Sequence, residues 1–277
     1  MGTALEAQKK YDEAITAYDK AINLSPEYDS AWYNKGNSLE ALGKHDEAIA
    51  AYNKAIKLKP TDENYWYNKG FALQAQEKYN EAIKAYDNSI IYYRNYSYTW
   101  YNKGVALYAI GKYNESIQAF DNATKLFDAE KVFWYSKALS LEMQGRFNES
   151  IQALNRAIEI DGNYTDAWKS KGRILFELGD YNESICAYNK AIDLNPLDES
   201  AITERDLAID SNSPKLVICQ IGRSERTVGG RGGPEETGGS PKPQRPIRPR
   251  DPPHPAPSAP SAGPNGGSNS NNRSPSI

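Results

Sequence analysis

Asparagine and tyrosine recur side by side at a fixed interval in the first half of the chain. The pairs are Tyr33–Asn34, Tyr67–Asn68 and Tyr101–Asn102. An amide side chain has one acceptor and two donors, so it can bond both the N–H and the C=O of an extended peptide without reading its sequence. A row of such amides at constant spacing could therefore hold a peptide backbone.

Residue types that catalyse reactions or bind metals are sparse. The chain has two histidines and two cysteines, and their spacing matches no zinc site. The sequence has no nucleophile elbow and no phosphate-binding loop. Glu and Lys alternate on the predicted helix surfaces, which is typical of a solvated face. We therefore expect a protein that is not an enzyme and that uses neither a metal nor a cofactor.

The tryptophans show that the chain is built from repeats, because all five are spaced by 34 residues. They are Trp32, Trp66, Trp100, Trp134 and Trp168. The sequence Trp-Tyr-Asn-Lys-Gly occurs at 32–36, 66–70 and 100–104, and variants of it occur at 134–138 and 168–172. A Leu follows each Trp by seven residues. One structural unit is therefore 34 residues long.

Each unit is expected to form two helices. Trp32, Gly36 and Leu39 are spaced to share one face of a first helix, and Gly43 can end that helix in the left-handed conformation. One face of the second helix is formed by Ala48, Tyr52 and Ala55. Alternating small and large residues let two helices approach closely. Such a pair cannot bury its apolar face alone, so neighbouring pairs must stack on it.

This pattern resembles the tetratricopeptide repeat (TPR) family, whose units carry Trp-x2-Leu-Gly-x2-Tyr, then Ala-x3-Phe, then Ala and Pro. The resemblance implies an all-α fold, a right-handed TPR superhelix (an α-solenoid) of antiparallel helix pairs. Two features depart from the family pattern. A Leu stands where the family has Tyr, and a Lys stands where the family has Leu. These lysines, Lys35 among them, must either reach solvent with their stems buried or meet a carboxylate.

The predicted TPR array covers 1–212, and a disordered tail rich in Pro, Gly, Ser and Arg follows at 213–277. The first unit lacks its Trp, so the chain is either a fragment of a longer protein or packs on something at this end. The predicted parts of the array are a partial repeat at 1–28, full repeats at 29–62, 63–96, 97–130, 131–164 and 165–198, and a terminal capping helix at 199–210.

Charge and hydropathy narrow the class of partner. Of 33 basic and 36 acidic residues, nine and four lie after residue 212, which leaves 24 basic and 32 acidic residues in the array, net -8. An acidic surface repels phosphate backbones, so we expect no nucleic acid on the array. No apolar run is long enough to span a membrane, and the N-terminus has no signal-peptide core. We expect a cytoplasmic protein without membrane contact.

The family resemblance implies that the first helices line a concave groove that binds a protein or an extended peptide. The asparagine row is similar to the asparagine ladders with which some family members grip a peptide backbone. An equally weighted alternative is that the asparagines cap or bridge neighbouring repeats. The predicted groove residues are Tyr33, Asn34, Asn37, Tyr67, Asn68, Phe71, Tyr101, Asn102, Tyr108 and Tyr135.

Two other functions remain open at this point. The chain could be a structural module that associates with itself, or a non-catalytic regulatory fragment of a larger protein. A carboxylate clamp of the kind found in another TPR subclass is rejected. Its basic positions hold Tyr33, Tyr98 and Asn102 here, so the charge-assisted bonds of that clamp cannot form. The leading hypothesis is a scaffold that binds a peptide or protein.

Overall fold

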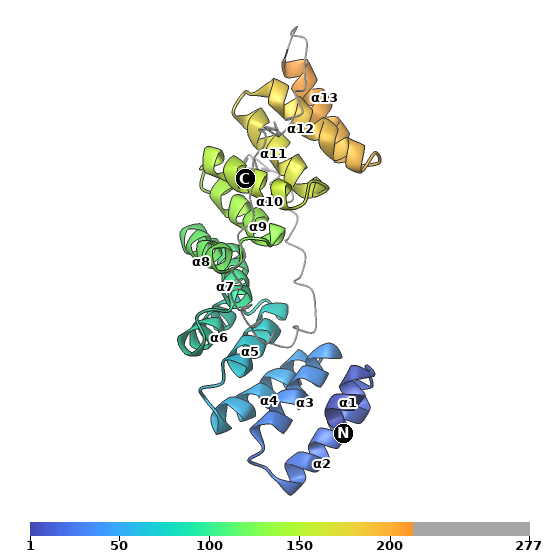
Figure 1. Cartoon of the computed structure of the whole chain (residues 1–277), viewed down its shortest axis with the longest axis vertical. Coiled ribbons are helices and arrows are strands. Elements are labelled where there is room, and N and C mark those ends of the chain that lie inside the picture. The colour runs from blue at the N-terminus through green and yellow to red at the C-terminus, as the bar shows by residue number, and fades with distance from the viewer. Residues whose placement is uncertain (213–277) are drawn as a thin grey trace, which may run out of the picture. The chain divides into compact units, whose positions relative to one another are not determined.

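The computed structural model describes residues 1–212, and the predicted tail at 213–277 lies outside the described residues. Within residues 1–212 the chain forms thirteen α-helices and no strand, which confirms the predicted all-α class (Figure 1). The helices are α1 (Gly2–Ala7), α2 (Tyr11–Leu24), α3 (Asp29–Ala41), α4 (His45–Leu58), α5 (Glu63–Ala75), α6 (Tyr79–Tyr92), α7 (Ser97–Ala109), α8 (Tyr113–Leu126), α9 (Lys131–Glu142), α10 (Phe147–Ile160), α11 (Thr165–Glu177), α12 (Tyr181–Leu194) and α13 (Glu199–Ser211).

The helices of this array pack in consecutive pairs, such as α3 with α4 and α5 with α6. Each second helix also contacts the first helix of the next pair, and first helices such as α3 and α5 contact one another. Contacts between neighbours alone are typical of an α-solenoid. One side of each first helix points away from the second helices. We call this side the first-helix face, and it is formed by α3, α5, α7, α9 and α11.

The turn within each pair has the predicted left-handed residue. Gly43 has φ +71°, and glycines at the same place in three later units have φ between +69° and +80°. The N–H of Lys44 donates to the Leu39 carbonyl (2.9 Å) and that of Gly43 donates to the Glu40 carbonyl (2.9 Å). These two bonds form a Schellman motif. Glu77 adopts the same conformation at φ +58° without being glycine.

A ring of the second helix lies directly against the backbone of the first helix in most units. A Cβ added to Gly36 would lie 2.5 Å from Cε1 of Tyr52, and one added to Gly70 would lie 2.7 Å from Cε1 of Tyr86. Both rings are fully buried. Glycine is therefore required for the close approach of the two helices rather than for a turn. The equivalent pairs are Gly2–Tyr18, Gly104–Phe120 and Gly172–Tyr188.

The fourth full unit reaches the same packing by a compensating change. It has Ala138 in place of the glycine, and the buried residue at the position of the ring is Leu154. Both belong to one apolar cluster. A methyl group added on the first helix is thus matched by a smaller side chain on the second, as volume conservation in a close-packed core requires.

The tryptophans join each unit to the turn that precedes it. The Nε1–H of Trp32 donates to the carbonyl of Pro26 (3.0 Å), and that of Trp100 donates to the carbonyl of Arg94 (2.9 Å). Trp66, Trp134 and Trp168 make the same bond to the residue six positions before them. The ring is half-buried in each case. The Trp therefore fixes the entry of the chain into each first helix as well as filling space.

The lysines that replace the family Leu lie over the Trp rings and reach the preceding unit. Lys103 Nζ lies 5.4 Å from the centroid of Trp100 and 2.6 Å from Asp87 Oδ1. A carboxylate partner was one of the two alternatives left open by the sequence. The contact recurs as Lys35–Asp19 (2.6 Å) and Lys137–Asp121 (2.7 Å), and as Lys171–Asn155 (2.8 Å) with an amide in place of the acid.

The two ends of the described array differ from the full units. At the start, the six-residue helix α1 packs on α2 with Gly2 against the Tyr18 ring. At the other end, α13 contacts α12 and buries Ala201 and Ala208. Ile209 occupies the place of the buried Leu residues of the full units and is 47% exposed. Helix α13 thus covers α12 and presents a more open face of its own.

Gly70→Ala is expected to destabilise the protein by about 1–3 kcal/mol, because its Cβ would overlap the Tyr86 ring. Adding Tyr86→Leu reproduces the Ala138–Leu154 pair. The double variant should therefore be less destabilised than the sum of the two single variants. Urea unfolding of the full chain measures all three.

Gly162→Ala is the matched control, since its nearest contact would be a backbone oxygen at 4.0 Å. It should change the free energy of unfolding by less than about 0.5 kcal/mol. Strict additivity of the Gly70 and Tyr86 changes would show that the ring and the glycine do not constrain each other.

Candidate functional site

Two of the predicted asparagines bond tyrosines of the preceding unit. Asn68 Nδ2 donates to the hydroxyl of Tyr33 (2.8 Å), and Asn102 Nδ2 donates to the hydroxyl of Tyr67 (3.0 Å). These contacts link α3 to α5 and α5 to α7. Bridging between repeats, one of the two alternatives open from the sequence, therefore describes the contacts of both amides.

The same position changes character in the later units, where serine replaces asparagine. The Tyr135 and Ser170 hydroxyls are 3.5 Å apart. Ser136 lies near Tyr101, but both hydroxyls are buried without a hydrogen-bond partner in the described part of the chain. The shorter side chain leaves a gap that an amide spans in the two units before it. The polar row thus weakens along the array.

Burial separates the predicted groove residues into two groups. Tyr67, Tyr101 and Asn102 are buried, with 8%, 1% and 3% of their surface exposed. Burial raises the pKa of all five predicted tyrosines, so their hydroxyls stay neutral at physiological pH. The half-buried group consists of Tyr33, Asn34, Asn37, Asn68, Phe71, Tyr108 and Tyr135.

One turn further along the first helices, a second row of side chains lies on the first-helix face. Asn37 Oδ1 accepts a hydrogen bond from the buried hydroxyl of Tyr52 (2.9 Å). The next units place Phe71, Val105 and Leu139 at the same position. The row therefore changes from polar to apolar after its first member.

The charged contacts on this face were not predicted from the sequence. Glu142 accepts two hydrogen bonds from Arg173 of the next unit, one of them at 3.0 Å. Burial raises the pKa of Glu142, and Arg173 opposes that shift. Glu6 accepts from the hydroxyls of Tyr18 (2.9 Å) and Ser38 (2.7 Å). In the sequence, such contacts are indicated only by opposite charges separated by about the length of one repeat, as Glu142 and Arg173 are.

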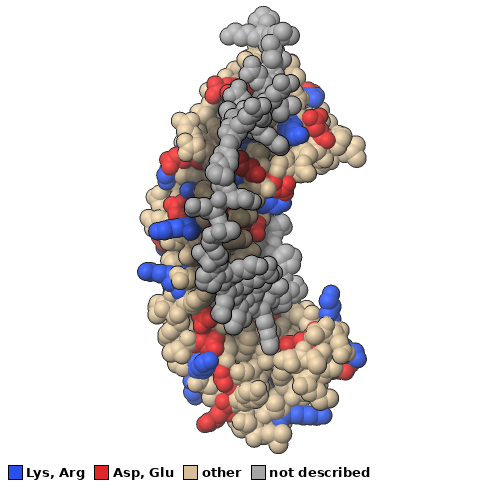
Figure 2. All heavy atoms as spheres, in the orientation of Figure 1, with Lys and Arg blue, Asp and Glu red and all other residues tan. Residues whose placement is uncertain are grey.

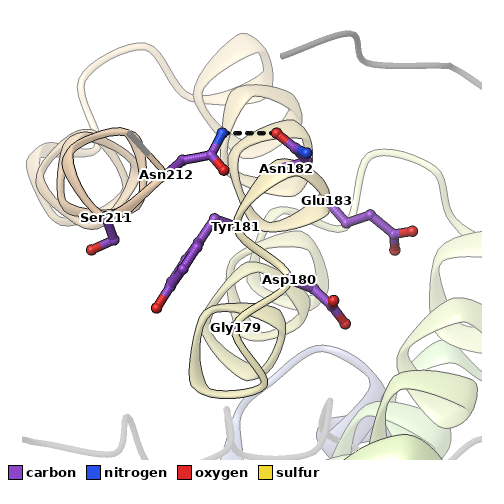
Figure 3. A pocket seen from close by; sticks show the side chains of 7 residues that line it. All are labelled: Gly179, Asp180, Tyr181, Asn182, Glu183, Ser211 and Asn212. Atoms are coloured by element: carbon purple, nitrogen blue, oxygen red, sulfur yellow. Dashed lines mark hydrogen bonds between the residues drawn. The ribbon is translucent and has the colours of Figure 1, made fainter. Parts of the chain in front are cut away.

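A pocket lies at the other end of the described array, away from every predicted residue. It is a hollow of about 500 Å³ between the start of α12 and the end of α13 (Figure 3). Asn212 donates to Asn182 across it (2.8 Å). The Asp180 and Glu183 carboxylates point away from Ser211 in this view, so neither of these two acids is directed at the Ser211 hydroxyl.

Other binding chemistry is limited in the part of the chain that the structure describes. No group of three His, Cys, Asp or Glu side chains among residues 1–212 is placed to hold a metal ion. No helix in that range has the length and apolar character needed to cross a membrane. Basic and acidic side chains are interspersed on the part of the face in Figure 2 that is not covered by grey atoms.

Family models match most of the array. A tetratricopeptide repeat model matches residues 1–63, 101–165 and 135–199, and a second tetratricopeptide repeat model matches residues 51–84. Together these matches cover more than half of the chain. No curated protein sequence matches it.

Solved structures of TPR proteins share the fold at low sequence identity. YrrB, described as a TPR protein with an unusual peptide-binding site, is 20% identical with a TM-score of 0.63, covering 69% of this chain and 98% of its own. MamA is 22% identical with a TM-score of 0.60, covering 62% and 93%. The C-terminal part of a TPR protein from Cytophaga hutchinsonii is 15% identical with a TM-score of 0.65, covering 75% and 83%.

Asn102→Ala is expected to cost about 1–3 kcal/mol of stability, because it leaves the buried Tyr67 hydroxyl without its donor. Asn34→Ala is the matched control, since the Asn34 side chain makes no hydrogen bond to a tyrosine among the described residues. That change should cost less than about 0.5 kcal/mol. Thermal and urea unfolding of the full chain measure both, and equal effects would contradict a bridging role for Asn102.

Ser136→Asn is expected to stabilise the protein by about 1 kcal/mol, because the amide can reach the unpartnered Tyr101 hydroxyl. The same change in a Tyr101→Phe background should give no gain. Urea unfolding of the four proteins in this cycle tests the prediction. Destabilisation in both backgrounds would show that the site has no room for the amide.

Proposed function

The chain belongs to the tetratricopeptide repeat family, and on that premise we propose that it is a protein–protein interaction scaffold that binds a peptide or protein segment along its first-helix face. TPR proteins are in general scaffolds without catalytic activity. The proposed site consists of the groove residues predicted from the sequence, of which the half-buried ones would contact the ligand.

The observation that carries the proposal is the set of large apolar side chains that the array leaves open on this face. Met143 is 50% exposed at the end of α9. Phe71 and Tyr108 are half-buried, and the small residues Ala75 and Ala109 beside them are exposed. Exposed apolar surface of this kind marks sites where proteins bind partners.

The half-buried predicted residues would touch the ligand directly, and the buried ones would hold the helices that present them. Asn34 and Asn37 belong to the first group. Tyr67, Tyr101 and Asn102 belong to the second, because almost none of their surface is exposed. A rigid set of helices lowers the entropy that binding must overcome.

Similarity to YrrB supports the same proposal, because that protein is described as having a peptide-binding site. At 20% identity the likeness establishes the fold alone. The ligand and the contact residues of this chain therefore rest on its own surface.

Self-association is the second candidate, and a row of exposed apolar residues favours it. Leu24, Leu58, Tyr92 and Leu126 close successive second helices at a spacing of 34 residues, and they are 89%, 38%, 43% and 40% exposed. Because the row is periodic, two copies could present matching surfaces to each other.

Selection of a random peptide display library on the full chain tests the leading proposal. Peptides are expected to be enriched, and Phe71→Ala should weaken a selected peptide about tenfold or more, since burial of an aromatic ring is lost. Gln118→Ala on α8 is the control, because that residue is exposed on a second helix and should leave binding unchanged.

The absence of any enriched peptide would contradict the proposed function. Light scattering over a concentration series of the same protein separates the second candidate. A mass that rises with concentration, together with no enrichment, would move the function to self-association.

A further inference from the structure

Apolar residues at the repeat position of Phe71 are confined to the middle units. Phe71, Val105 and Leu139 occupy one position in three successive units, with Tyr108 and Met143 beside them. We call these five residues the apolar strip. The same position holds Asn37 in the unit before and Arg173 in the unit after. The strip is therefore bounded by polar side chains at both ends.

At the α1–α3 end of the strip stand two carboxylates, Glu6 and Glu40. The partners of Glu6 are the hydroxyls of Tyr18 and Ser38. Glu40 Oε2 lies 2.9 Å from His45 Nδ1, and its side chain is only 11% exposed. Within residues 1–212 no Lys or Arg nitrogen lies within 4.0 Å of either carboxylate.

Glu6 and Glu40 both act electrostatically on the same residue, Tyr52. Both Glu6 and Glu40 raise the pKa of Tyr52, although burial of that tyrosine is the larger cause. The Tyr52 hydroxyl in turn donates to Asn37, which belongs to the same unit as Glu40 and precedes the unit of Phe71. The two units that precede the apolar strip thus carry the acids Glu6 and Glu40 on their first helices.

The other end of the strip differs because its acid is already neutralised. Glu142 is held by two hydrogen bonds from Arg173. A cationic ligand group would have to displace that guanidinium. At the α1–α3 end, by contrast, neither Glu6 nor Glu40 has a Lys or Arg partner among the described residues, and the basic group nearest Glu40 is the imidazole of His45.

Resting on the proposed function, we propose that the ligand is a peptide segment with a Lys or Arg at Glu6 and Glu40 and apolar side chains along the strip. A guanidinium or ammonium forms strong charge-assisted bonds with carboxylates that are partly shielded from water. An apolar segment without a cation would leave that charge unmatched.

The spacing of the units sets the spacing of the peptide residues. Packed helices lie about 8–10 Å apart, and an extended chain advances about 3.3 Å per residue. One unit therefore corresponds to about three peptide residues. The expected pattern is a basic residue followed, in one chain direction, by apolar residues about three, six and nine positions away. The first two would meet Phe71 and Val105, and the third would meet the exposed Met143, because Leu139 in the same unit is buried.

Selection of a random 12-residue display library on the full chain tests this inference. The enriched peptides should combine Lys or Arg with apolar residues at that spacing. A synthetic selected peptide should bind Glu40→Gln about tenfold more weakly than the wild type, and its affinity should fall as salt is raised. Glu47→Gln is the matched control, because that acid is exposed in the first turn of α4, and it should leave binding unchanged.

The outcomes separate this inference from the proposed function. Enriched apolar peptides without basic residues, or an affinity indifferent to Glu40→Gln and to salt, would overturn the inference and leave the proposed function standing. No enriched peptide would overturn both. If Glu40→Gln lowers the melting temperature, Glu6→Gln and the salt series decide in its place.

Discussion

Contact between a buried ring and the bare backbone of a glycine sets the distance between the two helices of a unit. Tyr86 occupies the space where a side chain at position 70 would otherwise stand. The ring extends past the first helix, so its hydroxyl reaches the far side of that helix and donates to Gln74 (3.0 Å). Tyr52 reaches Asn37 and Tyr18 reaches Glu6 in the same way. One packing requirement therefore also orients polar groups on the first-helix face.

The sequence predicted this framework because its signals are local and repeated. A Trp every 34 residues, a glycine four positions later and a left-handed turn are properties of one unit and its helical periodicity. The partners of the asparagines could not be read in the same way. Helical phase gives the direction of a side chain, whereas the Asn68–Tyr33 bond depends on how closely two successive units stack.

The lysines show the same limit. From the sequence, Lys35 and its equivalents could either reach solvent or bind a carboxylate. The carboxylate that Lys35 binds lies 16 residues earlier, in another unit. Where an asparagine replaces that acid, as at Asn155, burial lowers the pKa of the lysine, here Lys171. Lys69, whose counterpart is Asn53, is shifted in the same direction by burial. A carboxylate at this position is therefore suited to offset the desolvation of a partly buried lysine.

The use of amides between repeats limits how the face can hold a ligand. Three asparagines that gripped a peptide backbone at about 1 kcal/mol each would contribute about 3 kcal/mol, whereas micromolar affinity requires about 8 kcal/mol. Asn68 and Asn102 already donate to tyrosines, so even that contribution is reduced. Affinity must then come from apolar burial on Phe71 and its neighbours and from charge at one end. For this reason a ligand is expected to be selected by its side chains rather than by its backbone.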